Sequence, residues 1–223
     1  GEGCVFAGVT FAAAWHFLSR EPSTVRSRRY SSGWVLLALT VAMGFSGGRG
    51  WMQWPNFFEG KLSLDHFGPG GKYVPIAPIY GFIWLFIAGV PWAALGAVAL
   101  SWCGSKTRLS PLGWIGRILF GIAGFVIASY LFQTFPRVFL PLYDQINYRA
   151  PDIGYNLWRL IRDNRSAMQH LGLYLGFLSF EAVRKDWKNL TLILTVGLVS
   201  GIGWASLQNW RWASRVWPGV NFN

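Results

Sequence analysis

The chain has little charge, few cysteines and few histidines. Only 13% of its 223 residues are charged, whereas soluble domains typically carry about 25%, so the composition argues against an ordinary soluble fold. Its two cysteines and three histidines exclude a disulfide framework and show no metal-ligand spacing. No nucleotide-binding loop, metalloprotease motif or cysteine cluster occurs. We therefore expect neither a metal nor a cofactor.

Acidic residues are also scarce, which leaves a net charge of +11. A basic chain can indicate nucleic-acid binding. Here the positive residues gather in short clusters between apolar runs, which is the pattern of membrane topology. We therefore expect no nucleic-acid partner.

Apolar and aromatic residues are abundant instead. They make up 52% of the chain, with 14 tryptophans, and the mean hydropathy is +0.31. The segment Gly33 to Gly60 combines an uninterrupted apolar run, several glycines and an aromatic end. Membrane helices end in this way because tryptophan and tyrosine collect at headgroup depth.

Hydropathy predicts an all-α integral membrane protein with about six transmembrane helices in three hairpins, forming a single domain over residues 1–223. The expected spans are residues 4–18, 33–50, 76–102, 112–135, 170–183 and 190–207. The first is shorter than the roughly 20 residues that cross a bilayer core. It is therefore either truncated or also uses residues 1–3. Because the sequence starts with Gly1 instead of Met and almost inside an apolar run, we expect that a leader was removed or that residues precede Gly1.

Two long outer loops separate these spans, at residues 51–75 and 136–169. Within the second, Tyr155 to Met168 places leucines on one helical face and arginines largely elsewhere. This pattern predicts a short amphipathic helix that lies on the membrane surface or on the protein.

The short connections between spans are basic, and all fall on one side of the predicted threading. They contain Arg26 and its neighbours, then Lys106 and Arg108, then Arg184 and Lys185. The positive-inside rule assigns these hairpin turns to the cytoplasm. Both termini are then expected outside, and the expected partners are membrane lipids together with other membrane subunits or further copies of the chain.

A weak internal similarity suggests a hairpin repeat between residues 4–57 and 170–212. Residues 39–41 and 194–196 are both Leu-Thr-Val, and Gly48 and Gln53 match Gly203 and Gln208. Transporters built by duplication show such repeats. The other interpretation is that exit helices rich in glycine and tryptophan look alike.

Ser46 and His170 are the candidate catalytic pair. Ser46 lies in a Gly-x-Ser-Gly sequence, and His170 precedes glycines at 172 and 176. Over these few residues the chain resembles rhomboid intramembrane proteases. The resemblance implies a serine hydrolase at the outer face, with Ser46 as nucleophile and His170 as base. Glycines at four-residue spacing also occur wherever membrane helices pack closely.

Charges and small residues inside the spans allow two further predictions. Glu181 is a possible proton relay, although Arg184 stands at the spacing of an ion pair. Arg117 is expected to extend back to the interface. Small residues are expected to form a helix-packing face on the fourth span; they are Gly113, Gly116, Ala123 and Gly124.

Polar and aromatic residues near the outer ends of the spans form a candidate binding set. Amides and arginines among aromatic rings suit an anionic ligand, a sugar or lipid headgroups, and they also anchor helices at the interface. The set comprises Arg49, Trp51, Gln53, Arg137, Asp144, Gln208 and Asn209. The sequence favours a non-enzymatic membrane protein: a subunit or scaffold of a membrane assembly, or a small transporter.

Overall fold

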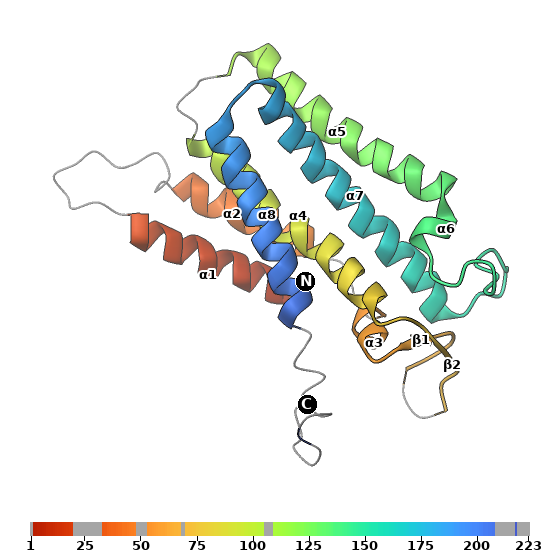
Figure 1. Cartoon of the computed structure of the whole chain (residues 1–223). Helices are drawn as coiled ribbons and strands as arrows, with labels where there is room; N and C mark the ends of the chain where they lie inside the picture. Colours follow the sequence, from red (N-terminus) through yellow and green to blue (C-terminus); the bar gives the residue numbers. More distant parts are fainter. Residues whose placement is uncertain are drawn as a thin grey trace.

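The computed structural model describes residues 2–19, 33–47, 53–67, 70–104, 109–207 and 217. This part of the chain is mostly helical (Figure 1). The longer helices are α1 (Glu2–Ser19), α2 (Gly33–Gly47), α4 (Ile79–Gly104), α5 (Pro111–Thr134), α7 (Tyr155–Val183) and α8 (Trp187–Leu207). The shorter elements are α3 (Trp54–Phe58), α6 (Pro136–Phe139), β1 (Lys61–Ser63) and β2 (Tyr73–Pro75).

Three of these helices are long and apolar enough to cross a membrane. They run over Ile79–Cys103, Pro111–Thr134 and Trp187–Leu207, so α4 continues through the buried Pro91. The prediction of a helical membrane protein is supported to this extent. The other three of the six predicted spans are not shown.

The helices pack in a different arrangement from the predicted hairpins. α1 packs against α2 as expected, but α4 packs along α8, and α5 along α7. α7 and α8 separate after a short turn at Arg184–Asp186, as Figure 1 shows. A central α4 therefore contacts α2, α7 and α8, while α5 lies at the edge of the bundle against α7.

Glycines allow α5 and α7 to approach closely. A methyl group at Gly124 would overlap the Gly172 carbonyl oxygen, and one at Gly176 would overlap the Phe120 carbonyl oxygen. Gly116 also faces α7, against Phe180. The predicted packing face was partly wrong, since Ala123 is exposed and Gly113 faces Leu109, within its own chain segment.

α7 is one continuous helix of 29 residues. The sequence predicted a separate amphipathic helix at 155–168 followed by a span from His170. The helical part of that prediction is confirmed, but no break separates the two segments. Leu157 and Leu160 are buried within the protein, where the first half of α7 packs against residues of the two long loops.

The described residues of the two predicted outer loops fold into a cap at one end of α4 and α7. α3 and the antiparallel β1–β2 pair lie at the start of α4, where Figure 1 shows them below the bundle. Gly60 follows α3 with φ of 76°, the left-handed conformation that ends many helices. Aromatic residues of α3, such as Phe57 and Phe58, are fully buried. We call the described residues of 53–76, 136–154 and the first half of α7 the cap.

Candidate functional site

A buried ion pair joins α5 to α7. Arg117 Nη2 lies 2.5 Å from Glu181 Oε1, and each side chain is only 1% exposed. Arg117 does not extend to the interface as predicted, because the close α5–α7 contact holds it opposite Glu181. The Glu181–Arg184 pair expected from their spacing is confirmed at 3.1 Å.

Further polar groups surround this pair at the start of α8. The Asp186 carboxylate accepts the backbone N–H of Asn189, which caps the helix. The Asn189 side-chain amide donates to Asp186 at 3.2 Å and reaches Glu181 at 3.5 Å. The two carboxylates thus face two arginines, and the cluster is charge-balanced. We call Arg117, Glu181, Arg184, Asp186 and Asn189 the inner cluster.

Aromatic rings enclose the Arg117 guanidinium. Its central carbon lies 4.8 Å from the Trp114 ring centre and 5.5 Å from those of Trp102 and Phe180. Such cation–π contacts contribute more when they are shielded from water. Buried in this way, Arg117 is not displayed to a ligand, and the inner cluster is built as a structural tie between helices.

A second network connects the distant parts of the cap. The Gln53 side-chain amide donates to the Ser63 carbonyl oxygen at 2.7 Å, and the Asn156 amide donates to Ser63 Oγ at 2.8 Å. Trp54 Nε1 donates to Asn164 Oδ1 at 2.7 Å, and Asn164 Nδ2 donates to the carbonyl oxygen of residue 139. These bonds hold both outer loops to α7.

The predicted binding set is only partly within the described residues. Arg49, Trp51, Gln208 and Asn209 lie outside them. Gln53 is buried in the cap network. Arg137 and Asp144 form an exposed ion pair with each other at 3.2 Å. Gln53 and the Arg137–Asp144 pair therefore make their described contacts with different residues, and the binding role of the set stays a prediction.

Ser46, the candidate nucleophile, lies at the end of α2. Its side chain is outside the described part, but the ring of the preceding Phe45 packs on His170 with 5.1 Å between centroids. His170 is buried. The end of α2 therefore lies next to His170, while Gly172 and Gly176 of the same motif are occupied by the crossing with α5.

An open apolar groove of about 370 Å³ lies between α4 and α8. Ser206 supplies the polar side chain of its lining. The other lining residues are Phe82, Ile83, Phe86, Ile87, Ile202 and Ala205. Such a lining suits hydrocarbon rather than a polar solute, because a buried polar ligand needs hydrogen-bond partners.

Sequence reasoning found the Glu181–Arg184 pair but missed its contact with Arg117 and the cap network. Arg117 and Glu181 are 64 residues apart, and no motif links them. Among the described residues no three potential metal-ligating side chains gather. Comparisons with protein-family models, with curated proteins and with solved structures give no match. The local resemblance to rhomboid proteases therefore depends on the few residues that carry it.

Proposed function

We propose that the chain is a non-enzymatic, multi-pass membrane protein that serves as a structural subunit or scaffold of a membrane assembly. The observation that carries the proposal is the contrast between its interior and its α5 face. Apart from Arg117 Nε and Arg159 Nε, the described buried side-chain polar atoms of the inner cluster and the cap have internal hydrogen-bond partners, whereas α5 presents an extended apolar surface. Such a surface requires lipid or another helix to cover it.

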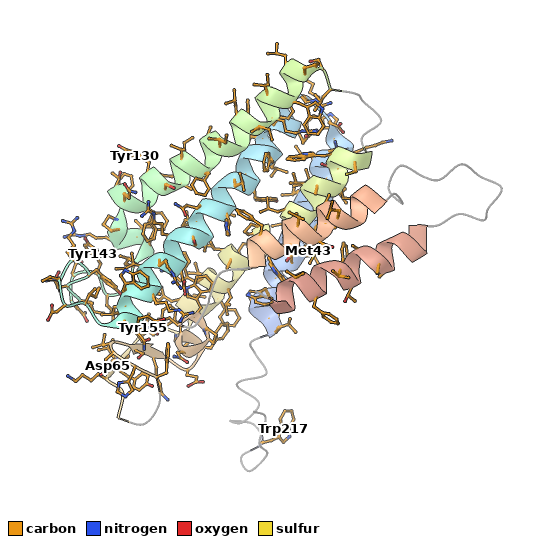
Figure 2. The ribbon with its side chains drawn as sticks, turned by 180° about the vertical axis from the view of Figure 1, so that it is seen from behind. Met43, Asp65, Tyr130, Tyr143, Tyr155 and Trp217 are labelled. Atoms are coloured by element: carbon orange, nitrogen blue, oxygen red, sulfur yellow. The ribbon has the colours of Figure 1, made fainter. Side chains whose placement is uncertain are left out.

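The α5 surface is large compared with that of α4. Within the apolar window of α5 only 22% of the residues are buried, against 61% for α4. Outward residues such as Ile115, Leu119 and Val126 are more than half exposed, and Figure 2 shows Tyr130 on the same outer side. Membrane helices associate through such faces by close packing. The partners we propose are lipids and either other membrane subunits or a second copy.

The same contrast favours a scaffold over a small transporter. A conduit for polar solutes needs polar groups along its path. The open α4–α8 groove is apolar, and the ion pair of Arg117 and Glu181 is enclosed by aromatic rings. For the orientation we propose basic turns in the cytoplasm and both termini outside.

Site-specific cross-linking tests the proposal. In a background with Cys4→Ser and Cys103→Ser, single cysteines at Ile122 and Val126 are treated with a bis-maleimide in intact membranes. We expect adducts of discrete mass from both positions. The matched control, a cysteine at the buried Ala97 of α4, should give none. A chain that stays monomeric from both α5 positions would contradict the subunit role.

A serine hydrolase is the second candidate, because the Phe45–His170 contact places the end of α2 beside His170. Here Ser46 would be the nucleophile and His170 the base. A fluorophosphonate probe should then label the protein, and Ser46→Ala should abolish labelling. The control is Ser200→Ala, since Ser200 only donates to the Gly89 carbonyl oxygen between α8 and α4. Equal labelling of wild type and Ser46→Ala would reject the hydrolase.

A further inference from the structure

The first half of α7 extends beyond the apolar span of α5. Gln169 donates to Ser129 at 2.9 Å, and Arg117 pairs with Glu181. Both contacts give the same antiparallel register, in which Thr134 at the end of α5 lies level with Asn164. At 1.5 Å per residue, the segment from Asn164 back to Tyr155 projects about 13 Å past the end of α5. Figure 2 shows Tyr155 at that end of α7.

This projecting segment carries arginines and exposed aromatic rings on one side. The residues follow helical spacing of three and four, and we call them the arginine stripe: Tyr155, Trp158, Arg159, Arg162 and Arg165. Tyr155 is 60% exposed and Trp158 is 49% exposed. Because Arg165 is level with the last turn of α5 and Tyr155 lies farthest out, the stripe crosses the depth of the lipid headgroups, which extend about 5–8 Å beyond the hydrocarbon.

The arginines exceed the acid available to pair with them. Asp163 is the acidic residue on this part of α7, and it is buried. Its carboxylate accepts from Arg162 at 3.1 Å, while Arg159 Nε is 4.0 Å away and makes no hydrogen bond. Within the described residues Arg165 has no ion pair or hydrogen bond, and it is exposed. The stripe therefore has a net positive charge.

Aromatic rings hold two of the guanidinium groups in place. The central carbon of Arg162 lies 5.2 Å from the Trp158 ring centre, and that of Arg159 lies 5.8 Å from the Tyr155 ring centre. Arg159 Nη1 also donates to the Tyr155 hydroxyl at 3.0 Å. A guanidinium fixed in this way loses less conformational entropy when it binds a phosphate, which it can contact through two N–H groups.

We propose that the arginine stripe of α7 binds the phosphate group of an anionic phospholipid at the outer end of the bundle. This inference rests on the proposed membrane embedding and adds a specific lipid class to it. The apolar α5 helix beside the stripe supplies a surface for the acyl chains, and Trp158 and Tyr155 are suited to the headgroup layer.

Native mass spectrometry of the detergent-solubilised full chain tests the proposal. Phosphatidylglycerol and phosphatidylcholine are titrated separately, and the dissociation constant of the first bound lipid is compared. We expect phosphatidylglycerol to bind roughly 25-fold more tightly, because three arginines against Asp163 leave two net positive charges, and each basic residue near an anionic lipid contributes about a fivefold gain in affinity. Arg165→Gln should lower the preference for phosphatidylglycerol over phosphatidylcholine about fivefold, whereas Arg165→Lys should retain most of the preference.

The triple variant with Arg159, Arg162 and Arg165 changed to glutamine should abolish the preference. It also leaves Asp163 unpaired, so the single Arg165→Gln variant provides the test if the triple variant does not fold. A matched control makes the same charge change elsewhere in the cap, by replacing three exposed basic residues with glutamine: Lys72, Arg137 and Arg149. It should keep the full preference.

Several results would overturn the inference. These are equal affinities for the two lipids, a preference unaffected by Arg165→Gln, and a preference lost in the matched control. Soluble glycerol phosphate that competes as strongly as the lipid would also contradict a lipid site. Flotation with phosphatidylcholine vesicles after an alkaline wash separates the two proposals. A chain that floats but shows no lipid preference refutes only the stripe, and a chain released by the wash refutes membrane embedding itself.

Discussion

Replacing Glu181 with glutamine should destabilise the protein strongly. The substitution keeps the shape of the side chain but leaves the Arg117 charge buried without its counter-ion. Both groups are 1% exposed, and removal of one partner from such a pair typically costs about 3–5 kcal/mol. For a chain of this size that cost corresponds to a Tm lowered by roughly 10 °C. Thermal unfolding of detergent-solubilised protein, followed by fluorescence-detected size exclusion, measures it.

Two further variants make this test specific. Asp144→Asn removes a carboxylate from the pair with Arg137, whose side chains are 73% and 75% exposed, so it should cost no more than about 1 kcal/mol. The double variant Arg117→Met with Glu181→Leu removes both buried charges and should recover most of the lost stability. The reasoning is refuted if Glu181→Gln lowers the Tm no more than Asp144→Asn does.

The remaining predictions concern the helix crossing and the cap. Gly172→Ala should lower the Tm, because the added methyl group meets the backbone of α5 and overpacking costs about 1–3 kcal/mol. Gly203 has open space around it, so Gly203→Ala should leave the Tm unchanged or raise it. A Tm lowered more by Gly203→Ala than by Gly172→Ala would contradict the α5–α7 crossing. The backbone N–H groups of His66 and Lys72 donate hydrogen bonds to the Asp65 carboxylate. These bonds lower the pKa of the Asp65 carboxyl. The resulting stabilisation of the turn should be present above about pH 4 and lost as the pH falls through the lower folded pKa. Hydrogen exchange of these two amides measures this loss, and Asp65→Asn should remove the pH dependence.

Sequence reasoning worked best where a single segment determines the outcome. Apolar run length predicted helices over 76–102, 112–135 and 190–207, and the structure has α4, α5 and α8 there. Helix start signals also act locally: Ser110 caps α5 by accepting the N–H of Gly113, with Pro111 in the first turn. The Glu181–Arg184 pair follows from spacing on one helix in the same way.

The predictions failed where distant segments meet. Residues 155–168 were predicted as a separate amphipathic helix on the membrane surface or on the protein; their leucines do pack on the protein, but the helix continues without a break into the rest of α7. The sequence predicted residues 51–75 only as a loop. Their apolar side chains, such as Phe57 and Leu62, are buried against residues of α4 and α7, and these distant partners are not visible in the local sequence. Among the candidate site residues, Gln53 proved to be a buried bridge between the cap segments.

The sequence by itself indicated lipid as the surroundings of this protein and predicted the helical form of its long apolar segments, because a bilayer requires each backbone polar group to be satisfied within its own helix. Only the tertiary structure decided which helices are neighbours. It packs α5 along α7 and not along α4, because glycines on α5 and α7 allow the backbones of these two helices to touch. That contact brings Arg117 to Glu181, and it sets how far α7 and its arginines extend past the end of α5.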